Sequence, residues 1–234
     1  MSRNQFEREG YTVEAVFDPP LVAAAAADIT DHIDRISQAL YLPFEDSLPG
    51  EPLGTRLDRI WERDRSQANL LRIAICTDAH RGPRLQSLID AAPLLAAAQG
   101  LTDERLTGQV VRMRAGIASF PEHLHPWHSD VARDDGTRCS RVCVTAWIPL
   151  SDAGPDSGGL EVIAGRRSSP LPHREENAFS ISERELAGHV PVRPFCPLGS
   201  VLFLDRFTPH RSLPVVGAAR FALVVWIKSD PQTI

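Results

Sequence analysis

The chain has 234 residues, a length that suits one large domain or two small ones. Hydrophobic residues make up 43% and charged residues 24%, as in ordinary globular proteins, and a net charge of −5 argues against a nucleic-acid-binding surface. No apolar run approaches the roughly 18 residues of a membrane span, and the opening MSRNQFEREGY lacks the apolar core of a secretory signal, so we expect a cytoplasmic protein without a membrane partner.

The N-terminal part is predicted to be mostly helical. Residues 20–42 are rich in alanine with spaced apolar positions, which is typical of an amphipathic helix. Residues 83–99 predict a second helical stretch, broken near Pro93. Between them, the prolines, glycines and charges of residues 43–68 favour a long loop.

After about residue 105 the pattern changes to short runs of Val, Ile, Leu and Phe that are separated by Gly, Pro, Asp and Ser. The runs predicted as strands are 109–118, 141–150, 158–165, 189–194, 199–206 and 220–228. Short strands bounded by such turns indicate a sandwich or barrel. We therefore expect a single domain over residues 1–234, with a helical part of about 1–105 packed on a β core of about 106–230.

The segment HPWHSD, residues 125–130, places a histidine two residues before an aspartate. Residues i and i+2 of a strand face the same side, so His128 and Asp130 can present an imidazole and a carboxylate together. A second His-x-Asp triplet, His32 to Asp34, falls in the first predicted helix, where residues two apart point about 200° apart. We interpret His32 as solvated helix surface.

A third ligand is expected from a distant strand, and His210 is the leading candidate. It follows an apolar strand that ends at Asp205, in a polar turn where β scaffolds often place functional side chains. Arg220 then opens the run RFALVVWIK, either as a surface residue or as a bidentate partner for a carboxylate.

Two histidines and one carboxylate with open coordination positions form the facial triad of non-haem Fe(II) oxygenases. The same ligands also bind catalytic zinc in hydrolases. A protein that only binds a small ligand is the third hypothesis. Turnover of 2-oxoglutarate that depends on iron would separate the three.

Four passages resemble the phytanoyl-CoA dioxygenase family of Fe(II)/2-oxoglutarate oxygenases: residues 8–29, PWHSD at 126–130, 145–168 and 199–212. The resemblance runs from about residue 8 to 228. It implies a mainly β fold, a cupin-like double-stranded β-helix or jelly-roll with the N-terminal helices packed outside. It also implies Fe(II) as cofactor, 2-oxoglutarate and O2 as co-substrates, and hydroxylation of an unactivated C–H bond in a small or medium-sized metabolite, with formation of succinate and CO2.

The resemblance also assigns roles to individual residues. His128, Asp130 and His210 would ligate iron, and Arg220 would bind the distal carboxylate of 2-oxoglutarate. Further co-substrate contacts are expected from Ser212, Trp147 and Thr145, with core packing as the competing interpretation for Trp147. An intact Asp130 favours hydroxylation over halogenation, because halogenating relatives carry a small residue in its place. The family's Pro-Gly-Ser-His is replaced here by residues 164–167, Ala-Gly-Arg-Arg, which leaves the substrate open.

Other polar residues near these motifs have competing interpretations. Arg114 either lies on a solvated strand face or recognises an acidic group of the substrate, and His125 could line the substrate entrance. His123 and His125 raise a rival metal site, although in an extended segment His128 has the opposite parity. Residues 166–177 form either a lid or an ordinary surface loop.

Overall fold

The structure is a computed structural model that describes residues 2–41, 51, 54–78, 82–118, 124–130, 141–174 and 179–230. Its helices are α1 (Ser2–Glu9), α2 (Pro19–Ala39), α3 (Thr55–Arg63), α4 (Arg65–Asp78), α5 (Pro83–Ile89) and α6 (Ala92–Gly100). Its strands are β1 (Tyr11–Ala15), β2 (Leu106–Gly116), β3 (Val142–Pro149), β4 (Leu160–Ile163), β5 (Pro191–Val192), β6 (Ser200–Asp205), β7 (His210–Ser212) and β8 (Arg220–Ser229). None of the described helices combines the length and apolar character that a membrane crossing needs.

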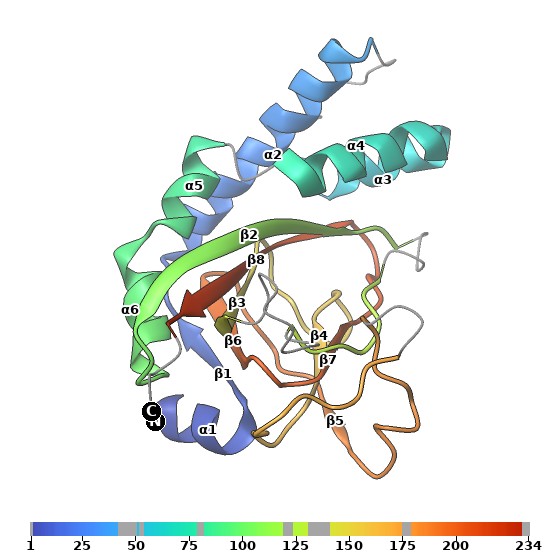
Figure 1. Ribbon diagram of the computed structural model, residues 1–234. Helices are drawn as coiled ribbons and strands as arrows, with labels where there is room; N and C mark the ends of the chain where they lie inside the picture. Colours follow the sequence, from blue (N-terminus) through green and yellow to red (C-terminus); the bar gives the residue numbers. More distant parts are fainter. Residues whose placement is uncertain are drawn as a thin grey trace.

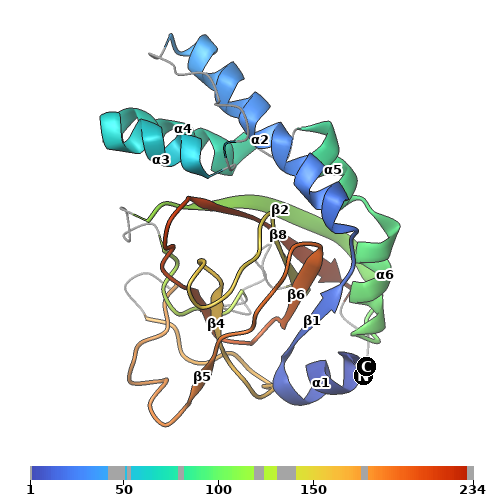
Figure 2. The same cartoon turned by 180° about the vertical axis from the view of Figure 1, so that it is seen from behind.

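The strands form two sheets, as expected for a jelly-roll. The larger has the order β1-β6-β3-β8-β2 and the smaller the order β5-β4-β7, and every pairing is antiparallel. Helices α2, α5 and α6 run along the outside of the larger sheet, and α3 and α4 lie above β2 (Figures 1 and 2). The predicted mainly β core with external helices is therefore confirmed.

Each central strand of the larger sheet faces two hydrophobic cores. On β6, Val201 and Phe203 pack against the helices, whereas Leu202 and Leu204 pack toward the smaller sheet. Both faces are buried, so the strand is a continuous apolar run instead of an alternating one. This double burial explains why the apolar runs predicted the central strands well.

The predicted loop between the first two helices is wrong. Of the described residues in the expected loop at 43–68, all but a few belong to α3 and α4. The segment that follows Gly54 is amphipathic and buries Leu57, Ile60 and Trp61, so core packing outweighs the nearby loop-forming residues. The expected helix at 83–99 is confirmed as two helices, α5 and α6, with the interruption just before Pro93.

His32 is not solvated helix surface; it is buried on α2, with Nδ1 against the Arg35 guanidinium. The same face of α2 carries the buried Asp28, whose carboxylate accepts the backbone N–H groups of Arg84 and Leu85 at 2.8 and 2.9 Å. Asp28 thus satisfies the first turn of α5. Packing of α5 and α4 on α2 covers a face that the helix pattern alone left exposed.

Asp58 links α3 to the larger sheet, because its Oδ2 accepts the backbone N–H of Ala219, just before β8, at 2.5 Å. Burial raises the pKa of Asp58 to about 6. The folded protein therefore binds this proton more tightly than the unfolded chain, whose Asp pKa is about 3.9. The stability contributed by Asp58 is fully present below about pH 4 and is lost as the pH rises through 6.

We expect the D58N variant, which keeps an acceptor oxygen but does not titrate, to gain stability relative to wild type as the pH rises from 4 to 7. Urea unfolding at several pH values measures the difference, with the exposed Asp18→Asn as the control. A difference that stays constant with pH would show that Asp58 is not protonated preferentially in the fold.

Candidate functional site

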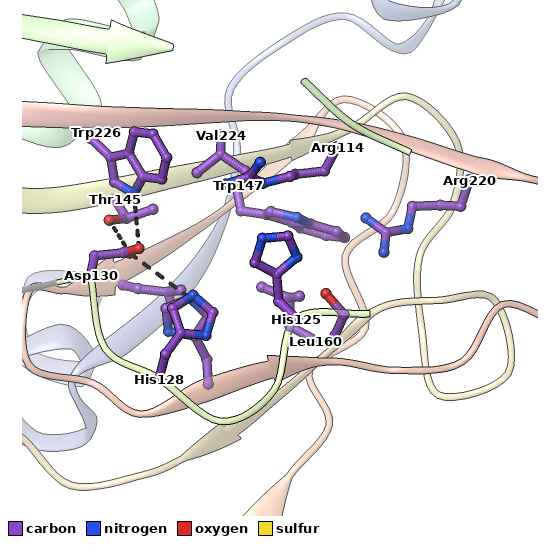
Figure 3. A pocket seen from close by; sticks show the side chains of 13 residues that line it. Arg114, His125, His128, Asp130, Thr145, Trp147, Leu160, Arg220, Val224 and Trp226 are labelled. Atoms are coloured by element: carbon purple, nitrogen blue, oxygen red, sulfur yellow. Dashed lines mark hydrogen bonds and ion pairs between the residues drawn. The ribbon is translucent and has the colours of Figure 1, made fainter. Parts of the chain in front are cut away.

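A cavity that is partly open to solvent lies between the two sheets. It brings together every residue that the sequence predicted for the site: Arg114, His125, His128, Asp130, Thr145, Trp147, His210, Ser212 and Arg220 (Figure 3). Its remaining described lining is Leu160, Leu204, Val224 and Trp226.

Strand register explains why these side chains meet. On β8, Arg220, Val224 and Trp226 share the face that points into the cavity, while the alternate residues Phe221, Leu223 and Val225 face the helices. Trp226 pairs with Thr145 and Val224 with Trp147 on β3, which aligns the inward side chains of neighbouring strands. Thr145 and Trp147, two residues apart on β3, both line the cavity, as expected for residues on the same side of a strand.

The proposed ligands come from two segments that pair with each other. His128 and His210 exchange two backbone hydrogen bonds, at 3.0 and 2.8 Å, so their backbones are locked side by side. His210 also begins the short strand β7, which pairs with β4, so the prediction of a polar turn at this residue is wrong. One ligand atom each from His128, Asp130 and His210 lies within 4.8 Å of the others, a spacing that fits a single metal ion.

The hydrogen bonds of the two imidazoles leave the correct nitrogen free for a metal. Nδ1 of His128 lies 2.8 Å from the carbonyl oxygen of Pro126, and Nδ1 of His210 lies 3.0 Å from that of Thr208. A carbonyl only accepts, so each Nδ1 carries the proton and each Nε2 keeps its lone pair. This fixing of tautomer and ring orientation by an outer partner is typical of metal-ligating histidines.

Asp130 is held by two donors. Thr145 Oγ1 donates to Oδ2 at 2.5 Å, and Trp226 Nε1 donates to Oδ1 at 2.8 Å. Burial raises the pKa of Asp130, but the imidazoles of His210 and His128 and these donors outweigh it, so the pKa lies below its usual range. Burial lowers the pKa of His128 to about 3. A carboxylate beside a neutral imidazole is the protonation state that binds a metal ion.

We expect Thr145→Val to weaken metal binding about tenfold, because outer-shell partners of metal ligands typically contribute 10–100-fold to affinity. Valine matches threonine in size but cannot donate to Asp130. Thr145→Ser keeps the hydroxyl and should bind metal almost as wild type does. Isothermal titration of the metal-free proteins with Co²⁺ tests this, and equal affinities for the two variants would contradict it.

Arg220 is buried at the first residue of β8, with 4% of its surface exposed. Its guanidinium lies 5.4 Å from the centre of the Trp147 ring, and no described residue hydrogen-bonds its Nε. Burial lowers the pKa of Arg220 to about 10, which leaves it charged at neutral pH. A buried guanidinium with an unused donor that faces a cavity fits an incoming carboxylate.

The backbone of Gly158 packs closely beside Arg220. Gly158 has φ +72°, and a Cβ there would lie 2.7 Å from Val215 and 3.2 Å from Arg220 Nε. Any larger residue would therefore press on the guanidinium as well as strain the turn.

The two residues expected near the substrate also line the cavity. Arg114 is half-buried on β2, with its guanidinium 5.7 Å from the Trp226 ring centre. Burial, followed by the charge of Arg114, lowers the pKa of His125 to about 4, so this imidazole is neutral. His125 is not among the clustered ligand atoms, and His123, its partner in the rival metal site, lies outside the described residues.

Sequence reasoning missed two residues of the site. Trp226 has the parity of Arg220 on β8, so the strand pattern could have placed it in the cavity. His173 contacts Ser129, between the two ligands of the HPWHSD segment, but it comes from an irregular segment that carries no periodic signal.

A jelly-roll whose cavity gathers two histidines and one carboxylate has the ligand set of the non-haem iron oxygenases. The model of the family "Phytanoyl-CoA dioxygenase (PhyH)" matches residues 6–222, and the chain belongs to this family of Fe(II)/2-oxoglutarate-dependent enzymes. No curated protein matches the chain.

Solved structures of low sequence identity share the fold. EctD from S. alaskensis, solved with 2-oxoglutarate and 5-hydroxyectoine, is 21% identical with a TM-score of 0.64 over 97% of this chain and 74% of its own. The carbocyclase SnoK from nogalamycin biosynthesis is 15% identical, with a TM-score of 0.61 over 97% and 83%. The epimerase SnoN, in complex with Fe3+, alpha ketoglutarate and nogalamycin RO, is 16% identical, with a TM-score of 0.57 over 100% and 86%.

Proposed function

We propose that residues 1–234 form one catalytic domain that uses Fe(II), 2-oxoglutarate and O2 to hydroxylate an unactivated C–H bond of a small or medium-sized metabolite in the cytoplasm. Succinate and CO2 are the co-products. The observation that carries the proposal is the convergence of His128, Asp130, His210 and Arg220 on one cavity.

The protein's contribution is to bind, orient and exclude water. His128 and His210 would offer Nε2 and Asp130 would offer Oδ2 to the iron, which with its co-substrates supplies the oxidising power. Arg220 would hold the distal carboxylate of 2-oxoglutarate, with Ser212, Trp147 and Thr145 along its length. The apolar walls at Leu160, Leu204 and Val224 keep this space poor in water.

The substrate would enter on the side of Arg114 and His125. These residues line the cavity and are assigned neither to the metal nor to the distal carboxylate. The half-buried charge of Arg114 would favour a substrate with a polar or acidic group.

Anaerobic titration of Fe(II)-loaded protein with 2-oxoglutarate tests the proposal without knowledge of the substrate. We expect a weak metal-to-ligand charge-transfer band in visible light, which is lost in His210→Ala. A folded protein that binds iron but gives no band would overturn the oxygenase assignment and favour a zinc hydrolase. Absence of metal binding would favour a non-catalytic protein.

The reaction outcome needs its own measurement, because ring closure and epimerisation are the activities named for SnoK and SnoN. With a compound that stimulates succinate formation, hydroxylation places one oxygen atom from ¹⁸O2 in the product. Ring closure or epimerisation gives a product without that label.

A further inference from the structure

The segment that carries His128 and Asp130 is held from both sides. On one side, the backbone of His128 pairs with His210. In an extended chain the neighbouring residues direct their backbone groups the opposite way, so Trp127 and Ser129 need partners on the other side.

Those partners come from the segment that follows β4. The backbone N–H of Ile181 donates to the carbonyl of Trp127 at 2.6 Å, as in an antiparallel pair. The next donor in this ladder is the N–H of Ser129, and it meets the imidazole Nε2 of His173 at 3.2 Å. A side-chain nitrogen thus takes the place that a strand carbonyl would fill.

His173 is itself fixed in the tautomer that this contact requires. Its Nδ1 lies 2.9 Å from the carbonyl oxygen of Leu171, so Nδ1 carries the proton and Nε2 accepts. The backbones of His173 and Ile181 form a bridge, which joins the two anchor points. Ile181 packs with the buried Trp127 in a small hydrophobic cluster of its own.

The same segment also contacts a ligand side chain directly. The ring of Phe179 stacks on that of His128, with centroids 4.8 Å apart and planes at 28°. The segment that holds the backbone of Trp127 and Ser129 therefore also contacts the ring of His128.

We infer that His173 is a positioning residue of the metal site, which holds the backbone between His128 and Asp130 in the geometry that chelates the ion. The inference rests on the proposed function. His173 acts through Ser129 and touches neither ligand, so its loss should weaken metal affinity without removing a ligand.

Isothermal titration of metal-free protein with Co²⁺ alone tests this. His173→Leu removes the acceptor at similar size, and we expect about tenfold weaker binding, as for other outer-shell partners. His173→Gln places an acceptor oxygen near the position of Nε2 and should restore most of the affinity. His189→Leu makes the same change at an exposed histidine and should bind as wild type does.

The outcomes separate the inference from the function on which it rests. Wild-type protein that binds no Co²⁺ would contradict the metal site itself. Wild type and a folded H173L variant with equal affinities would contradict only the role of His173. If the H173L variant does not fold, hydrogen exchange of the Ser129 amide in wild type is measured instead. Slow exchange, together with near-wild-type Co²⁺ affinity of H173Q, supports the role of His173. Rapid exchange overturns it.

Discussion

Replacing Asp130 with alanine is expected to lower 2-oxoglutarate turnover about a thousandfold or more. An outer-shell partner of a metal ligand already contributes about 10–100-fold to affinity, and Asp130 is a proposed ligand. Its loss also leaves the donors of Thr145 and Trp226 without their acceptor. Succinate formation under saturating iron and 2-oxoglutarate measures the effect.

The control for this variant is Asp156→Ala, which removes an exposed carboxylate outside the cavity and should leave turnover unchanged. Thermal unfolding of both variants without metal separates loss of the site from loss of the fold. Turnover by folded D130A within about tenfold of wild type would mean that Asp130 is not a ligand.

Replacing Arg220 with leucine is expected to raise the KM for 2-oxoglutarate about 100-fold, which corresponds to about 3 kcal/mol for a lost charge-assisted pair in a buried site. The burial of Arg220 and the absence of a described partner for its Nε are the reasons for so large an effect. Arg220→Lys keeps the charge but not the paired donors, so its KM for 2-oxoglutarate should lie between those of wild type and R220L.

The affinity for Co²⁺ alone distinguishes a co-substrate contact from a damaged site. It should be unchanged in R220L, because Arg220 is not a proposed metal ligand. Arg112→Leu, at an exposed arginine on β2, is the matched control and should keep the KM of wild type. An R220L variant with normal KM would remove the reason to place 2-oxoglutarate at this end of the cavity.

The sequence predicted the β core well because it depends on strand parity and apolar runs, and the nine residues singled out from parity or from the family resemblance line one cavity. Apolar runs marked β3, β6 and β8, and the i, i+2 rule brought His128 and Asp130 together. Parity is a local property, so it survives in the sequence without knowledge of the tertiary fold.

The failures have the opposite origin. Whether His32 is exposed depends on which helices cover α2, and α3 forms because Leu57 and Trp61 find a core to fill. Likewise, β7 is a strand only because it pairs with β4, and its first residue also bridges His128. Contacts between distant segments decide these features, and single-residue patterns do not encode them.

The alternation along β8 limits how this family member can change over evolutionary time. Arg220, Val224 and Trp226 serve the cavity, while Phe221 and Leu223 serve the helical core. Deleting or inserting one codon within the strand would exchange the two sets, sending the cavity's polar groups toward the helices. A single substitution alters one side chain of the strand, whereas a change of length misplaces all of them, so we expect insertions and deletions to be better tolerated in the connections between strands.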